Sequence, residues 1–186
     1  MELIWIRHGK TAGNLEKRYI GTTDEPLCEE GRFELNAKAY PAADVVIASP
    51  KKRCIETAAL LYPGKTQVIC EELRECDFGV FEGKNYLELS EIPEYQRWVD
   101  SGGTLSFPGG ESLEAFKNRC IRGFNAAVRT CSAARRIAFV VHGGTIMAVL
   151  ERYAWPKRAY YDFQVKNGCG YVTVFDGEKI TMIEEL

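Results

Sequence analysis

The residues with the clearest capacity for chemistry are the only two histidines of the sequence, His8 and His142. Each follows a short apolar run and precedes glycine, in Arg7-His8-Gly9 and in His142-Gly143-Gly144. Imidazole serves as a nucleophile, a proton carrier or a metal ligand near neutral pH, and glycine lets backbone amides approach a ligand closely. Either histidine alone could be a turn residue with satisfied hydrogen bonds. Two histidines in matching surroundings indicate a shared site.

Arginines stand near the same kind of predicted strand end. Arg7 directly precedes His8, and Arg53 lies in Ser49-Pro50-Lys51-Lys52-Arg53, which follows another apolar run. A planar guanidinium pairs with two phosphoryl oxygens at once, so both arginines are candidates for binding a phosphate group. On spacing alone, however, Arg53 is better explained as part of a solvated basic helix face.

An acidic stretch at residues 71–77 could supply a proton donor. Spacing does not choose among the four carboxylates there, each of which could equally be surface charge: Glu71, Glu72, Glu75 and Asp77.

The apolar runs that carry these groups predict a parallel sheet. Residues 3–6, 45–48 and 137–141 do not alternate with polar residues, which is typical of strands buried on both faces. A later pair at 170–175 and 179–183 surrounds the turn Asp176-Gly177, and its first member could be an edge strand available for pairing. Ligands of open parallel sheets bind beyond the carboxyl ends of the strands, where the two histidines would meet.

Helical patterns alternate with these strands, at 29–40, 51–61, 112–131 and 145–153. Ser49 could cap the second of them, with Pro50 in its first turn. The alternation predicts an α/β fold, a three-layer sandwich in which a mostly parallel central sheet has helices on both faces. We expect one domain over 1–186, with a glycine- and proline-rich excursion at about 78–110 that shapes a binding site.

Composition narrows the possible partners and the location. Of 186 residues, 46% are hydrophobic and 27% charged, and the net charge of -2 gives no general attraction to nucleic acid or an acidic membrane surface. No apolar run approaches the ~18 residues of a spanning helix. The seven cysteines form no Cys-x-x-Cys pair, and a strand begins near Met1 instead of a signal peptide, so we expect a cytoplasmic protein with reduced thiols. The sequence does not distinguish a monomer from a homodimer.

Several other chemistries lack their motifs. No cysteine has an arginine six residues later, and there is no Gly-x-x-x-x-Gly-Lys-Ser/Thr phosphate loop, Gly-x-Gly-x-x-Gly fingerprint or Gly-x-Ser-x-Gly elbow. Two histidines without a matching acid cluster make a poor metal site, so no metal is expected.

The motifs together resemble the histidine phosphatase superfamily, in its phosphoglycerate mutase-like branch. The matching blocks span almost the whole chain and are, in order, Arg7 to Asn14, Arg18 to Gly31, Ser49 to Ala58, Leu73 to Gly83, Pro108 to Ser112 and Val141 to Gly144. The resemblance implies a metal-independent phosphatase without a cofactor that acts on a small-molecule phosphate ester. It implies His8 as the nucleophile, Glu75 as the general acid, and Arg7, Arg53 and His142 as the phosphate pocket. It also implies substrate contacts at Asn14, Thr11, Gly21 and the backbone of Gly143.

Some positions depart from the family pattern. Lys10 stands where glutamate is frequent, Gly13 where an aromatic residue is frequent, and Phe81 replaces a common tryptophan. Cys28 replaces the usual helix-capping threonine, so that cap should be weaker. Lys10 and Gly13 are expected near the pocket mouth, where they would affect substrate identity.

The pattern from Arg74 to Gly83 most resembles the alpha-ribazole phosphatases, which implies alpha-ribazole 5'-phosphate as the substrate. The alternatives are a phosphatase of sugar phosphates or phosphoglycerate, a phosphoglycerate mutase, and a non-catalytic phosphate-binding module. Aromatic residues of the excursion and of 155–161 could stack on a ligand ring, although packing is the better explanation for each of Tyr86, Tyr95, Trp98, Tyr160 and Tyr161.

Overall fold

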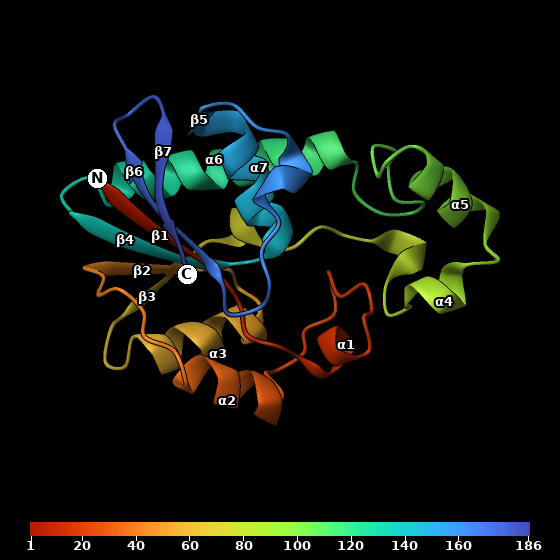
Figure 1. Ribbon diagram of the computed structural model, residues 1–186, viewed down its shortest axis with the longest axis horizontal. Coiled ribbons are helices and arrows are strands. Elements are labelled where there is room, and N and C mark those ends of the chain that lie inside the picture. The colour runs from red at the N-terminus through yellow and green to blue at the C-terminus, as the bar shows by residue number, and fades with distance from the viewer.

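A seven-stranded mixed sheet forms the middle layer of the protein in the computed structural model, which describes residues 1–186 (Figure 1). Its strand order is β3-β2-β4-β1-β6-β7-β5. The strands are β1 (Glu2–Arg7), β2 (Val45–Ala48), β3 (Gln67–Ile69), β4 (Arg136–Val141), β5 (Ala154–Trp155), β6 (Gly170–Phe175) and β7 (Ile180–Glu185). The pairs from β3 through β2 and β4 to β1 are parallel, as is β5 with β7, whereas β6 runs antiparallel to both β1 and β7. The mostly parallel sheet that the sequence predicts is confirmed.

Helices cover both faces of this sheet, which completes the predicted three layers (Figure 1). One face carries α2 (Glu29–Asn36) and α3 (Lys52–Leu61), and the other carries α6 (Leu113–Thr130) and α7 (Gly143–Tyr153). The remaining helices are short: α1 (Ala12–Leu15), α4 (Tyr86–Leu89), α5 (Pro93–Asp100) and the 3-10 turns η1 (Glu71–Leu73), η2 (Gly79–Phe81) and η3 (Tyr160–Phe163). None of the helices is both long enough and apolar enough to span a membrane.

Alternate side chains of the central strands enter two separate cores, which explains their unbroken apolar runs. From β1, Leu3 and Trp5 pack toward α6 and α7, whereas Ile4 and Ile6 pack toward α3. The core on the α6 side is the larger, and Trp5 stacks there on Phe139 of β4 with ring centroids 4.6 Å apart. Both faces of the strand are therefore buried, as the sequence pattern indicates.

Helix α6 illustrates how local sequence determines these layers. Ser112 caps it by accepting a hydrogen bond from the amide of Ala115 at 3.1 Å. Its buried residues recur at helical spacing on one face, namely Phe116, Arg119, Cys120, Gly123, Phe124 and Ala127. The charged member of this face, Arg119, contacts the acidic stretch rather than the apolar core.

Three sequence expectations about the elements are wrong in detail. The strand 170–175 is not an edge strand, because β6 lies between β1 and β7. The helix expected at 29–40 ends at Asn36, ahead of Pro41, whose ring disfavours helix in the residue before it. Ser49 does not cap α3, whose N-cap Lys51 makes no side-chain hydrogen bond. The Ser49 hydroxyl accepts a hydrogen bond from the Lys51 amide at 3.4 Å, ahead of the helix, and lies 2.7 Å from Nε2 of His142.

The excursion at 78–110 contains η2, α4 and α5 and projects beyond the carboxyl ends of β1 and β4 (Figure 1). Its aromatic side chains pack on one another, with Phe81 within 5.3 Å of Tyr95 and 5.8 Å of Phe107 between ring centroids. The excursion therefore has an aromatic core of its own beside the ends of the central strands.

Candidate active site

His8 follows the last residue of β1 and is 3% exposed. Its Nδ1 lies 2.7 Å from the carbonyl oxygen of Gly9, and because a carbonyl only accepts, Nδ1 must carry the proton of the neutral ring. Burial, together with the charges of Arg53 and Arg7, holds the pKa of His8 well below its ordinary 6.5. His8 is therefore neutral near pH 7, and its Nε2 keeps a free lone pair.

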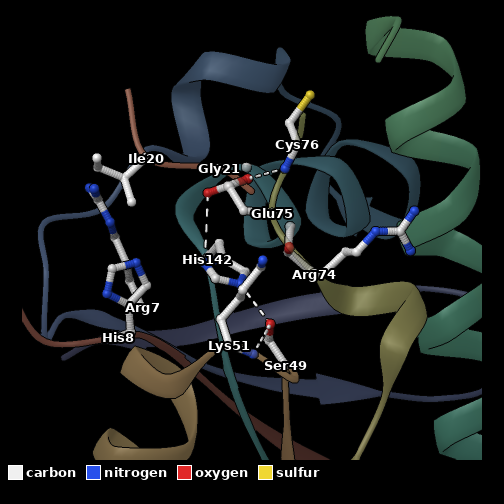
Figure 2. A network of polar contacts seen from close by, with 12 residues as sticks. Arg7, His8, Ile20, Gly21, Ser49, Lys51, Arg74, Glu75, Cys76 and His142 are labelled. Atoms are coloured by element: carbon white, nitrogen blue, oxygen red, sulfur yellow. Dashed lines mark hydrogen bonds and ion pairs between the residues drawn. The ribbon is translucent and has the colours of Figure 1, made fainter. Parts of the chain in front are cut away.

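His142 follows β4 and stands at the N-cap of α7, fully buried. The ring centroids of His8 and His142 lie 5.2 Å apart, so the two strand ends do bring the histidines together. Figure 2 shows the His142 ring between Ser49, whose Oγ is 2.7 Å from Nε2, and Glu75, whose Oε2 is 3.9 Å from Nδ1. Burial and the charge of Arg53 hold the pKa of His142 well below 6.5. This second imidazole is also neutral.

Arg7 and Arg53 each present a buried nitrogen without a hydrogen-bond partner. Arg53 is fully buried, and its terminal nitrogens donate to the carbonyls of Thr23, Ile20 and Gly21. A terminal nitrogen of Arg7 donates to the carbonyl of Val165 at 2.8 Å. The Nε atoms of both arginines are buried and unpaired, which is costly unless an acceptor such as a phosphoryl oxygen binds there. The prediction from spacing alone that Arg53 belongs to a solvated helix face is therefore wrong.

Glu75 lies on the segment after η1, and its side chain is 12% exposed. Its Oε1 accepts a hydrogen bond from the amide of Cys76 at 3.0 Å. Burial raises the pKa of Glu75 above its ordinary 4.5, although the Cys76 amide and the charge of Arg53 oppose the change. Of the four candidate acids, Glu75 is the one whose carboxyl faces His142. This carboxyl can hold a proton at a higher pH than a solvated glutamate can.

Arg7, His8 and Glu75 line a pocket of about 320 Å³, whereas the fully buried Arg53 and His142 are not among its lining residues. Its walls combine the chemistry-bearing residues with a largely apolar and aromatic lining: Arg7, His8, Asn14, Arg18, Tyr19, Ile20, Glu75, Cys76, Phe78, Trp98, Gly103, Phe107, Leu113, Phe116, Gly144, Met147, Tyr160, Tyr161 and Gln164. Trp98, Tyr160 and Tyr161 thus line the pocket, whereas Tyr86 is exposed and Tyr95 packs in the aromatic core of the excursion. No group of three or more His, Cys, Asp or Glu side chains is arranged as a metal site.

The expected substrate contacts differ in where the structure places them. Asn14 lines the pocket. Gly143 begins α7, where amides have no intrahelical acceptor, and a Cβ added to it would come no nearer to Arg7 than 3.6 Å. Gly21 lies behind the pocket wall, because its carbonyl holds Arg53 and a Cβ there would clash with the carbonyl of Cys76. Thr11 is fully buried and caps α1 by accepting from the Asn14 amide, so it does not line the pocket.

Two residues that depart from the family pattern, Lys10 and Gly13, are not among those that line the pocket. Lys10 pairs with Glu30 and Glu34 at 2.6 Å each, on the side of α2. Gly13 is buried, and a side chain there would lie 2.6 Å from Ile20. The expectation that Lys10 affects the pocket mouth is therefore wrong, whereas Gly13 lies directly behind Ile20, which lines the pocket.

Two polar residues missed from the sequence hold the His8 loop in place. Thr57 of α3 accepts a hydrogen bond from the Gly9 amide at 3.0 Å. The Asn167 side chain donates to the His8 carbonyl at 3.0 Å and to Asn14 Oδ1 at 3.2 Å. Asn167 belongs to no recognisable sequence motif. The only signal that could have connected it with the site is its position just before β6, the neighbour of β1.

The site combines a neutral buried imidazole that has a free nitrogen, two unpaired arginine Nε donors and a carboxyl whose pKa is raised by burial. This arrangement is suited to phosphoryl transfer through histidine. A family model described as the histidine phosphatase superfamily (branch 1) matches residues 3–184. The chain belongs to this superfamily, as its motifs indicate.

The similar proteins carry names of both mutase-like proteins and phosphatases. The chain is 31% identical over 192 residues to phosphoglycerate mutase-like protein 4 of Arabidopsis thaliana, covering 97% of this chain and 83% of the relative. It is 33% identical over 150 residues to phosphoserine phosphatase 1 of Hydrogenobacter thermophilus, covering 76% and 71%. The crystal structure of alpha-ribazole phosphatase from Shigella flexneri superposes with a TM-score of 0.87 at 26% identity, covering 98% of this chain and 95% of that one.

Proposed function

We propose that the protein is a phosphatase that hydrolyses a small-molecule phosphate monoester through a phosphohistidine intermediate on His8. In the first step, Nε2 of His8 attacks phosphorus in line, and the bond between phosphorus and the ester oxygen breaks. Arg7, Arg53 and His142 donate to the oxygens of the transferring group, together with the Gly143 amide. The unpaired Nε atoms of the two arginines support this role, because phosphoryl oxygens would satisfy both.

Glu75 carries the protons in both steps of this proposal. As the ester bond breaks, the Glu75 carboxyl gives its proton to the leaving alkoxide, which is otherwise too basic to depart readily. The resulting carboxylate then takes a proton from a water molecule whose oxygen attacks the phosphohistidine. The bond between phosphorus and Nε2 breaks, inorganic phosphate leaves, and both His8 and protonated Glu75 are restored. The raised pKa of Glu75 supports the first transfer.

The observation that carries the substrate assignment is the lining of the pocket on the side of the alcohol. Aromatic rings dominate it, and the only lining cation besides Arg7 is Arg18. Arg18 is already paired with Glu16 and Glu88 at 2.6 Å each. A carboxylate on the leaving group would therefore find no free cation. An alcohol that carries an aromatic ring and no further anion fits better, and we propose alpha-ribazole 5'-phosphate as the substrate.

A phosphate-release screen tests this assignment. We expect kcat/KM for alpha-ribazole 5'-phosphate to exceed that for 3-phosphoglycerate, phosphoserine and sugar phosphates by about 10-fold or more, the scale at which one unpaired buried charge discriminates. Preference for a carboxylate-bearing substrate would overturn the assignment of the alcohol and leave the histidine chemistry untouched. Isomer formation from phosphoglycerate, at a rate comparable to phosphate release, would instead indicate a mutase.

Labelling tests the covalent step. The wild-type protein, quenched during turnover of a labelled ester, should carry acid-labile, base-stable phosphate, and His8→Ala should carry none and release none. Normal labelling of His8→Ala, with the variant still folded by circular dichroism, would contradict the assignment of His8.

As part of the same proposal the enzyme acts in the cytoplasm, where its seven free cysteines stay reduced.

A further inference from the structure

Arg119 is a buried cation that lies outside the pocket lining. It projects from α6 toward the segment that precedes Glu75 and is 4% exposed. Its Nε and Nη2 donate to the two carboxylate oxygens of Glu111, at 2.9 and 2.7 Å. Its Nη1 donates to the carbonyls of Glu72 and Arg74 at 2.8 and 2.9 Å, and Nη2 donates also to the carbonyl of Glu75 at 3.3 Å. All five N–H groups of the guanidinium are thus occupied.

These bonds fix the backbone on both sides of the Glu75 carboxyl. Three carbonyls between Glu72 and Glu75 point at one guanidinium. On the far side, the amide of Glu111 donates to the carbonyl of Asp77 at 2.9 Å. The bidentate pair of Arg119 and Glu111 therefore forms a bracket that contacts the segment at four carbonyl groups.

The Glu75 carboxyl itself is held only loosely. Its one hydrogen bond comes from the neighbouring amide of Cys76, and His142 Nδ1 is 3.9 Å away. A carboxyl that must give up and regain a proton cannot be tied down by strong donors, because these would lower its pKa. Its position must then come from the backbone to which it is attached.

We propose that Arg119, fixed by Glu111, is a positioning residue that holds the backbone of Glu75 so that its carboxyl reaches the leaving-group oxygen. The inference rests on the proposed role of Glu75 as proton donor. A displacement of about 1 Å in such a group costs on the order of 100-fold in rate. Lysine keeps the charge of Arg119 but has three donors on a point charge, so it cannot reproduce the planar five-bond arrangement.

The experiment compares Arg119→Lys with wild type on two esters of similar size, p-nitrophenyl phosphate and benzyl phosphate. The nitrophenolate leaves without a proton, whereas the benzyl alkoxide requires one. We expect kcat/KM for benzyl phosphate to fall about 10- to 100-fold and kcat/KM for p-nitrophenyl phosphate to stay near the wild-type value. Because kcat/KM covers only the steps through phosphoryl transfer, slower hydrolysis of the phosphohistidine does not obscure the difference.

Two comparisons separate positioning from general damage. In a Glu75→Gln background, Arg119→Lys should cause no further loss on benzyl phosphate, since its whole effect passes through Glu75. Arg122→Lys is the matched control, because Arg122 is one turn along α6 and pairs with the Glu72 side chain but holds no backbone carbonyl of the segment. It should behave like wild type on both esters.

The possible outcomes are distinguishable. Equal losses on the two esters, or a further loss in the Glu75→Gln background, would overturn the positioning role. If Arg119→Lys does not fold, Glu111→Gln is assayed in the same way, because glutamine retains one acceptor oxygen and should give a smaller loss of the same selectivity. Absence of turnover by the wild type, or full activity of His8→Ala, would count against the proposed function rather than against this inference.

Discussion

Replacing Gly144 by alanine should separate proton donation from phosphate binding. A Cβ at this position would lie 2.8 Å from Oε1 of Glu75 and 3.0 Å from the ring of Phe116. Ordinary contacts begin at 3.4 Å, so the carboxyl must move by about 0.6 Å. The Phe116 ring belongs to a buried core and has little room to yield.

A shift of this size should lower kcat/KM for benzyl phosphate about 10- to 100-fold, which corresponds to about 1.4 to 2.7 kcal/mol of transition-state stabilisation. The value for p-nitrophenyl phosphate should change little, because its leaving group needs no proton. Steady-state assays of both esters at pH 7, with free phosphate as the readout, measure the difference.

The adjacent glycine provides the matched control. A Cβ on Gly143 would approach Arg7 no closer than 3.6 Å, which is ordinary contact, and both glycines lie in the first turn of α7. Gly143→Ala should therefore lack the selective loss. The same selective loss on benzyl phosphate relative to p-nitrophenyl phosphate in both variants, or no effect of Gly144→Ala, would refute the argument that the Glu75 carboxyl packs against the start of α7.

Two further predictions concern stability. Gly170→Ala would place a Cβ 1.7 Å from the carbonyl oxygen of Trp5 and force β6 away from β1. Urea denaturation should therefore show that the free energy of unfolding falls by about 3 kcal/mol, and a fall of less than about 1 kcal/mol would contradict this packing. The second prediction uses a Glu75→Gln background, because the raised pKa of the Glu75 carboxyl would have the opposite effect on stability. The free energy of unfolding should decrease as the pH falls below about 6.5, by up to about 1.4 kcal/mol per pH unit for each histidine, because His8 and His142 bind protons in the unfolded chain but stay neutral in the folded protein. A flat profile between pH 5 and 7 would contradict their neutral state.

Local pattern was sufficient to predict the strands that present His8 and His142, because a strand buried on both faces needs an unbroken apolar run. The edge strands β3 and β5 were not predicted, since they contain only three and two residues, too few to show a hydrophobic pattern. The position of β6 depended on which strand β1 pairs with, and this is a property of the whole sheet that no local window contains.

The site shows the same division between local and long-range information. Arg53 resembled a solvated residue beside two lysines, because spacing reports a helix face but not what later covers it. Glu75 could be chosen from four acids only by resemblance, since its burial depends on packing against α7. Ser49 looked like a helix cap until His142, 93 residues away, supplied a partner for its hydroxyl. For Thr11 the expected substrate contact is replaced by a local one, because the capping box with Asn14 occupies its hydroxyl.

The place of β1 in the sheet has a consequence for how the protein is made. The strand that carries His8 is synthesised before both of its partners, β4 at 136–141 and β6 at 170–175. One edge of β1 thus stays unpaired until β4 has been translated and the other until β6 has been, and the loop at His8 lacks its contact with Asn167 until residue 167 has been added. Pairing over such sequence distances is slow, and an apolar strand with two open edges is a target for aggregation. The nascent chain should therefore depend on chaperones until β4 and β6 have emerged from the ribosome.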